Sequence, residues 1–124
     1  MKQNYIGIDI IEIYRIKDAI NTWGERFLRR IYTDAEIGLY QNSLESLAVR
    51  FSGKEAVIKA LRISDQSLKW KDIEILNENN GRPTVNLYGQ ARKQFLDLGL
   101  KDLEISLSHS RENAIALVIG VRED

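Results

Sequence analysis

The chain has 124 residues, 44% of them hydrophobic, which suits a domain built around one hydrophobic core. Its 18 basic and 18 acidic residues cancel, so it lacks the net positive charge of a general nucleic-acid binder, although a local basic patch remains open. The absence of cysteine excludes disulfides and thiolate metal sites, and no apolar run is long enough to span a bilayer. We therefore expect a single cytoplasmic domain over residues 1–124, with no membrane segment and no signal peptide.

Hydrophobic periodicity predicts the element order β-α-α-α-β-β-α-β-β. In chain order we expect a strand at 5–11, helices at 12–23, 33–41 and 44–62, strands at 72–77 and 84–88, a helix at 90–98, and strands at 103–108 and 114–121. The last strand is apolar on both faces and should therefore be central in its sheet. The expected fold class is α+β, an antiparallel sheet with the long helix packed on it.

Local signals support several of these boundaries. Thr33 and Glu36 have the spacing of a capping box, which marks a helix start. Gly24 and Gly99 follow the helices at 12–23 and 90–98 and are suited to ending them. The sequence Glu-Asn-Asn-Gly-Arg-Pro at 78–83 is a strong turn signal, so the strands around it should form a hairpin.

The helix predicted at 44–62 carries a narrow polar stripe between two apolar sides. At helical spacing the stripe consists of Ala48, Ser52, Glu55, Lys59 and Arg62. A helix that is apolar on most sides is buried, and a buried carboxylate needs a partner, a metal ion or a proton. Glu55 and Lys59 are four residues apart, so an ordinary ion pair on a solvated strip is the alternative interpretation.

Polar groups elsewhere stand at unusual positions. Asp9 lies in an apolar strand, where a carboxylate is costly to bury; an exposed strand end or a helix cap is the alternative. His109, the single histidine, lies in a predicted turn, where an exposed residue is the simpler interpretation. Asp9 and Glu55 offer hard oxygen ligands that suit Mg²⁺, and Lys59 could neutralise a phosphate beside them.

The basic cluster at 26–30 is either a solvated face or a docking site for an acidic partner.

Five separated segments together resemble the 4′-phosphopantetheinyl transferases of the holo-acyl-carrier-protein synthase type. These segments, spread over essentially the whole chain, are Tyr5–Glu12 with Arg15 and Ile16, Arg26–Ile31 with Thr33 and Glu36, Ala48–Leu61, Asn80–Pro83, and Ile105–Ser110. The resemblance implies transfer of the 4′-phosphopantetheine arm of coenzyme A to a serine of an apo acyl-carrier protein, with release of adenosine 3′,5′-bisphosphate. It also implies a homotrimer with active sites between subunits, in which His109 can serve the site of a neighbouring chain.

The resemblance implies a role for each residue of the polar cluster. Asp9 and Glu55 would be the Mg²⁺ ligands and would also hold the pyrophosphate of coenzyme A. Lys59 would contact the phosphates at the scissile bond. Phosphoryl transfer depends mainly on positioning and charge neutralisation, which these groups could supply. The base that takes the serine proton stays open between a metal-held water and Glu55.

The same resemblance implies further binding residues. Contacts with the nucleotide phosphates, including the 3′-phosphate, would come from Arg50, Lys54, His109 and Ser110. Carrier proteins are acidic, so docking would use the basic side chains of Arg15, Arg26 and Arg30.

The chain departs from the family pattern in two places. The family usually has Ala-Ala before Lys-Glu, where this chain has Ser52-Gly53, and glycine lowers helix propensity. The family often follows the helix with a Gly-Thr-Gly loop, which residues 62–66 replace here, with Arg62 as a substitute charge. The altered loop motivates an alternative, a non-catalytic carrier-protein-binding module of the same fold. A general Mg²⁺-dependent phosphohydrolase is a third possibility.

Overall fold

The computed structural model describes residues 4–64 and 68–122, so part of the connection predicted at 63–67 lies outside the described residues. Its elements in chain order are β1 (Tyr5–Glu12), α1 (Ile13–Trp23), α2 (Glu25–Ile31), α3 (Asp34–Tyr40), α4 (Leu44–Ala60), the 3-10 turn η1 (Trp70–Asp72), β2 (Ile73–Asn77), β3 (Pro83–Leu87), α5 (Gly89–Asp97), β4 (Leu100–His109) and β5 (Asn113–Arg122). Every predicted strand and helix is present near its predicted bounds. The prediction missed α2 and the short turn η1.

Helix α2 escaped prediction because its basic residues obscure a short apolar face. Phe27, Leu28 and Ile31 have helical spacing and pack toward the core, but the segment is only 7 residues long. Gly24 separates it from α1 by adopting φ +56°, a left-handed conformation that glycine tolerates. The two helices are therefore joined at one residue, which leaves no loop to mark the boundary in the sequence.

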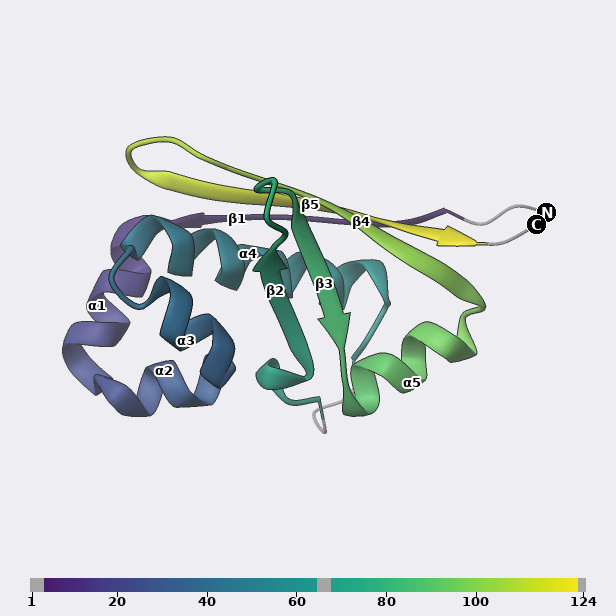
Figure 1. Ribbon diagram of the computed structural model, residues 1–124, viewed down its shortest axis with the longest axis horizontal. Coiled ribbons are helices and arrows are strands. Elements are labelled where there is room, and N and C mark those ends of the chain that lie inside the picture. Colours follow the sequence, from purple (N-terminus) through teal and green to yellow (C-terminus); the bar gives the residue numbers. More distant parts are fainter. Residues whose placement is uncertain (1–3, 65–67, 123–124) are drawn as a thin grey trace.

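Two antiparallel sheets flank the long helix α4. The larger has the strand order β1-β5-β4, which confirms that the strand with two apolar faces is central. The smaller is the predicted β2–β3 hairpin. Figure 1 shows the larger sheet along one side of α4, with α1, α2 and α3 gathered at one end of the molecule and α5 at the other. The predicted α+β class, with a long helix packed on an antiparallel sheet, is confirmed.

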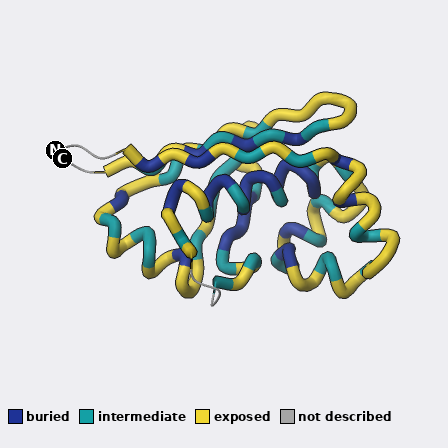
Figure 2. The backbone as a smooth tube through the Cα atoms, turned by 180° about the vertical axis from the view of Figure 1, so that it is seen from behind, coloured by how far each residue is buried: buried dark blue, intermediate teal, exposed yellow. Residues whose placement is uncertain are grey.

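Helix α4 is buried along most of its length because each apolar side has a partner. Ala56, Val57 and Ala60 join a core with the hairpin and the larger sheet, whereas Leu47 and Val49 join a second core with α1 and α2. Figure 2 shows this helix as the darkest part of the backbone. Among the described residues, no helix is long and apolar enough to cross a membrane.

Strand β1 lies almost in backbone contact with α4 at Gly7. A Cβ atom at Gly7 would lie 1.9 Å from the carbonyl oxygen of Ala56, so only glycine fits there. Side chains alternate along this strand: Ile6 and Ile8 face outward and are more than half exposed, whereas Gly7 and Asp9 face the helix. The close approach at Gly7 therefore brings Asp9, two residues later, against the polar stripe of α4.

Capping chemistry fixes the ends of the helices that carry the site. Thr33 and Glu36 form the predicted capping box at the start of α3. Ser43 caps α4 by accepting a hydrogen bond from the backbone N–H of Ser46 at 3.2 Å.

A glycine is required in the middle of α4 for a steric reason. A Cβ atom at Gly53 would lie 2.5 Å from Cδ1 of the buried Ile75. The glycine thus accommodates the large side chain that the hairpin presents to the helix.

Candidate active site

The carboxylate of Asp9 is held between two side chains of α4. Lys59 Nζ lies 3.3 Å from Asp9 Oδ1 and donates a hydrogen bond to the carbonyl oxygen of Ile8 at 3.0 Å. The Ser52 hydroxyl lies 2.9 Å from the Asp9 carbonyl oxygen and 3.1 Å from Asp9 Oδ2. Only 16% of the Asp9 side chain is exposed, so it is not an exposed strand end. The structure therefore joins a strand residue and a helix stripe that are more than 40 residues apart in sequence.

Glu55 completes this cluster electrostatically. Burial raises the pKa of the Glu55 carboxyl, the negative charge of Asp9 raises it further, and Lys59 partly opposes both effects. A carboxylate whose ionisation a neighbouring negative charge disfavours is an arrangement that a divalent cation relieves. Asp9, Ser52, Glu55 and Lys59 are called the Asp9 cluster below.

The chemistry of the Asp9 cluster fits Mg²⁺. Its donors are two hard carboxylate groups, and Mg²⁺ is commonly bound through one or two carboxylates together with waters and substrate phosphates. Across residues 4–64 and 68–122, no group of three or more His, Cys, Asp or Glu side chains could hold a metal ion. Two carboxylates leave most positions around Mg²⁺ for other oxygen ligands, such as water or phosphate oxygens.

A hollow of about 250 Å³ opens beside Glu55. Its lining residues are Glu55, Ile58, Ile63, Ser64, Leu68 and Trp70. The lining is mostly apolar, and among the described residues that form it Glu55 is the one ionisable group. A substrate with an apolar or amide-bearing arm could thus lie here with its charged end toward the Asp9 cluster.

A second hollow, of about 320 Å³, contains two of the predicted nucleotide-binding residues, Arg50 and His109. His109 ends β4 and is exposed, with Nδ1 3.4 Å from the carbonyl oxygen of Ser110. The Ser110 hydroxyl accepts a hydrogen bond from the N–H of Asn113, which shapes the turn. Since β1 and β4 lie on opposite sides of β5, the fold does not bring His109 to Asp9 within one chain.

Arg50 is already engaged by its own chain. Its guanidinium donates to the carbonyl oxygen of Ile75 at 2.9 Å and to Asn77 Oδ1 at 3.1 Å. It also lies 3.4 Å from the centre of the Tyr40 ring, and only 2% of the residue is exposed. Burial lowers the pKa of Arg50, and Tyr40 and Glu36 oppose that shift. Arg50 thus forms a fixed positive wall of the second hollow.

Lys54 does not reach either hollow. It forms a fully buried ion pair with Glu36, with 2.8 Å between Nζ and Oε1, and it donates to the carbonyl oxygens of Trp70 and Ile73. Burial lowers the pKa of the Lys54 ammonium, and Glu36 opposes the shift. This placement differs from the expectation that Lys54 surrounds the nucleotide phosphates. The same Glu36 carboxylate closes the capping box with Thr33, so one acidic residue serves α3 and α4 together.

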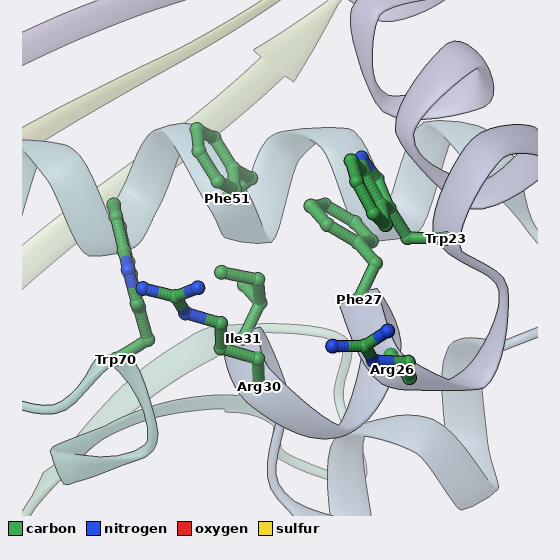
Figure 3. Close-up of a pocket in the computed structure, with 7 residues that line it drawn as sticks. All are labelled: Trp23, Arg26, Phe27, Arg30, Ile31, Phe51 and Trp70. Carbon is green, nitrogen blue, oxygen red and sulfur yellow. The ribbon is translucent and has the colours of Figure 1, made fainter.

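The predicted basic cluster borders a hollow of about 520 Å³. Figure 3 shows its lining, which consists of Trp23, Arg26, Phe27, Arg30, Ile31, Phe51 and Trp70. Phe51 and Trp70 stack with 5.0 Å between ring centres. Sequence reasoning missed this aromatic lining because its residues come from four separate elements, α1, α2, α4 and η1. Trp70 also lines the hollow beside Glu55, so one side chain forms part of both walls.

The predicted docking arginines differ in their surroundings. Arg15 lies 3.2 Å from Glu12. In the described part of the chain, no carboxylate lies within ion-pair distance of Arg26 or Arg30, which are both exposed. These two cations beside an aromatic hollow suit an acidic partner with an apolar anchor.

Arg62, the expected substitute for the missing glycines, points toward the start of β1. Its guanidinium lies 4.6 Å from the centre of the Tyr5 ring and donates to the carbonyl oxygen of Asn4 at 3.3 Å. The residue adopts φ +56°, a conformation that favours glycine. The backbone at this helix end therefore adopts a conformation suited to glycine, and Arg62 adopts it with strain.

Comparisons with known proteins match the chain to one family. A family model described as the 4′-phosphopantetheinyl transferase superfamily matches residues 5–118. The holo-[acyl-carrier-protein] synthase of Dehalococcoides mccartyi is 55% identical over 116 residues, which cover 94% of this chain and 97% of that protein. The corresponding synthase of Herpetosiphon aurantiacus is 40% identical, with 93% and 96% covered.

Solved structures show the same similarity. The Helicobacter pylori holo-[acyl-carrier-protein] synthase in complex with coenzyme A has a TM-score of 0.83 and 32% identity, and the match covers 93% of this chain and 98% of that one. The Neisseria meningitidis synthase has a TM-score of 0.83 at 28% identity, with 94% and 97% covered.

Proposed function

This chain belongs to the 4′-phosphopantetheinyl transferase superfamily and is a phosphopantetheinyl transferase, and we propose that it transfers 4′-phosphopantetheine from coenzyme A to a serine of an apo acyl-carrier protein in a Mg²⁺-dependent reaction. The second product is adenosine 3′,5′-bisphosphate. The observation that carries the proposal is the convergence of Asp9, Glu55 and Lys59 across β1 and α4. The arrangement would supply two carboxylates for the metal ion and one cation for the phosphates.

In the proposed mechanism the protein positions and neutralises charge. Asp9 and Glu55 would hold Mg²⁺, which when bound would polarise the phosphoryl group and screen the pyrophosphate of coenzyme A. The Lys59 ammonium, whose side chain is 53% exposed, can turn from Asp9 to a phosphate oxygen. The Glu55 carboxylate is one candidate for the base that accepts the proton of the incoming serine hydroxyl. A metal-held water is the alternative base.

The nucleotide end of coenzyme A is assigned to the hollow that contains Arg50 and His109. His109 and Ser110 are exposed and would contact the 3′-phosphate, while Arg50 contributes a fixed positive charge to the wall. Lys54 adds positive charge only at a distance, because its ammonium is buried against Glu36. Similar solved structures are described as complexes with coenzyme A, which supports a site for this substrate.

A homotrimer would join the two halves of this site. In one chain, Asp9 and His109 lie on opposite edge strands of the larger sheet. The outer face of that sheet carries three isoleucines that are each more than half exposed, Ile6, Ile8 and Ile10. An apolar face of this kind is typical of a surface covered by another subunit. Association through it would allow His109 of one subunit to serve the Asp9 cluster of the next.

The carrier protein is assigned to the face that carries Arg15, Arg26 and Arg30. The rate of carrier-protein modification should fall steeply with salt, because the docking charges are exposed. Arg26→Ala and Arg30→Ala should raise the KM for the carrier protein. Arg29→Ala is the matched control, since Arg29 lies on the same helix but is paired with Glu25 at 2.9 Å. An equal effect of all three substitutions would contradict this docking face.

Mass spectrometry of apo acyl-carrier protein tests the whole proposal. Incubation with coenzyme A, Mg²⁺ and the wild-type chain should add the mass of 4′-phosphopantetheine, and Asp9→Asn or Glu55→Gln should abolish the gain. Full activity in both variants would refute the metal assignment. Binding of the carrier protein without any transfer would favour the non-catalytic module. Release of phosphopantetheine into water without a carrier protein would identify a phosphohydrolase.

A further inference from the structure

Ser52 is a buried polar residue whose hydroxyl is directed at the proposed metal ligand Asp9. The residue is completely buried, and its hydroxyl lies within hydrogen-bond distance of two oxygens of Asp9, the carbonyl oxygen at 2.9 Å and Oδ2 at 3.1 Å. A serine inside a helix is neutral to unfavourable for helix stability, so its presence requires another reason. Serine also stands here where the resembled family usually has alanine.

The two contacts of the Asp9 carboxylate differ in how firmly they are held. Lys59 reaches Oδ1 with a side chain that is 53% exposed and that the proposed mechanism assigns to a substrate phosphate. Ser52 reaches Oδ2 from inside the helix, with a short side chain that has one rotatable carbon–carbon bond and no contact with solvent. When Lys59 turns to the substrate, Ser52 remains as the fixed contact of the carboxylate. Hydrogen bonds of this kind orient metal ligands and influence metal affinity.

We infer that Ser52 is a positioning residue, which holds the carboxylate of Asp9 in the orientation that binds the metal together with Glu55. The inference rests on the proposed function, because it presupposes that Asp9 is a metal ligand. It explains why a hydroxyl is buried at the contact between β1 and α4, where the neighbouring contacts at Gly7, Ala56 and Ala60 are apolar or backbone contacts. Ser52 itself touches neither substrate nor metal in this assignment.

The test compares two serine-to-alanine substitutions on the same helix. Ser52→Ala removes the hydroxyl next to Asp9; alanine is smaller and is the best helix former, so the variant should fold. Ser43→Ala is the matched control, because Ser43 caps the start of α4 and its loss affects stability without touching the Asp9 cluster. Mn²⁺ serves as the probe, and electron paramagnetic resonance measures its binding to each variant with saturating coenzyme A and no carrier protein. Activity is then measured as a function of Mg²⁺ concentration.

Ser52→Ala should weaken Mn²⁺ binding by about tenfold, within the range found for residues that orient metal ligands. The Mg²⁺ concentration for half-maximal activity should rise by a similar factor, while the rate at saturating Mg²⁺ and the KM for the carrier protein stay close to wild type. Ser43→Ala should lower the melting temperature and leave Mn²⁺ affinity unchanged.

The inference would be overturned if Ser52→Ala bound Mn²⁺ with an affinity within about twofold of wild type. It would also be overturned if Ser43→Ala lost as much Mn²⁺ affinity as Ser52→Ala. Asp9→Asn separates this failure from that of the proposed function. If Asp9→Asn leaves Mn²⁺ affinity unchanged, the metal assignment itself is wrong. If Asp9→Asn abolishes binding while Ser52→Ala does not weaken it, the metal assignment stands and the positioning role is wrong.

Discussion

Gly7→Ala is the substitution that most directly probes how the fold builds the site. The new Cβ atom would lie 1.9 Å from the Ala56 carbonyl oxygen and 2.8 Å from the Ala60 nitrogen. Ordinary contact begins at 3.4 Å, so β1 and α4 would have to separate by the difference, about 1.5 Å. Overpacking usually costs about 1–3 kcal/mol. Because the obstructing atoms here are backbone atoms of a buried helix, we expect a loss near or above 3 kcal/mol, or roughly 10 °C or more in melting temperature.

The same displacement should impair the chemistry, because Asp9 lies two residues beyond Gly7 on the moving strand. Misplacement of catalytic groups by about 1 Å can lower a rate by about 10²-fold. Thermal unfolding and the carrier-protein mass assay measure the two effects. Gly38→Ala is the control: a Cβ atom at Gly38 meets nothing within 4 Å, and alanine in helix α3 should stabilise the protein by up to about 1 kcal/mol. A Gly7→Ala variant with wild-type stability and activity would refute this account of the strand–helix contact.

Other substitutions test the surroundings of the site. Lys54→Met should destabilise the protein by about 3–5 kcal/mol in urea unfolding, because it leaves the Glu36 carboxylate buried without its cation; a loss below 1 kcal/mol would show that water reaches the pair. The raised pKa of Glu55 means that the folded state holds its proton more tightly, so this residue lowers stability as the pH rises above the unfolded value near 4.5. In the absence of metal, Glu55→Gln should therefore melt higher than wild type at pH 7.5 and equally at pH 4; no difference at pH 7.5 would contradict the shift. Arg62→Gly should be more stable than Arg62→Ala by about 1 kcal/mol, because φ is +56° at this residue; the reverse order would argue against that conformation.

The sequence was sufficient to predict the helix that carries the site. Its apolar residues cover two sides of α4, and that pattern correctly predicted a buried helix with one polar stripe. The strand that carries Asp9 was also predicted, at 5–11, and the structure has it at Tyr5–Glu12. Periodicity could not predict that Asp9 and the stripe would meet, because their contact depends on the close packing of Gly7 on Ala56.

Other features depended on tertiary contacts that local patterns do not encode. Lys54 follows Gly53 on a side of α4 that the β2–β3 hairpin covers, so its charge had to be neutralised internally by Glu36. The capping-box spacing predicted Glu36 at a helix start but gave no sign of this second partner. The aromatic hollow beside Arg26 and Arg30 combines side chains from α1, α2, α4 and η1, and no single stretch of sequence contains its pattern.

A crystal structure with coenzyme A and Mn²⁺ would test the central claim most directly, since the anomalous signal of Mn²⁺ locates the metal independently of the protein density. We predict one anomalous peak at bonding distance from the carboxylates of Asp9 and Glu55, with the pyrophosphate beside Lys59 and the 3′-phosphate at His109 of a neighbouring subunit. A metal peak away from both carboxylates, or coenzyme A bound without any contact to the Asp9 cluster, would contradict the proposed site.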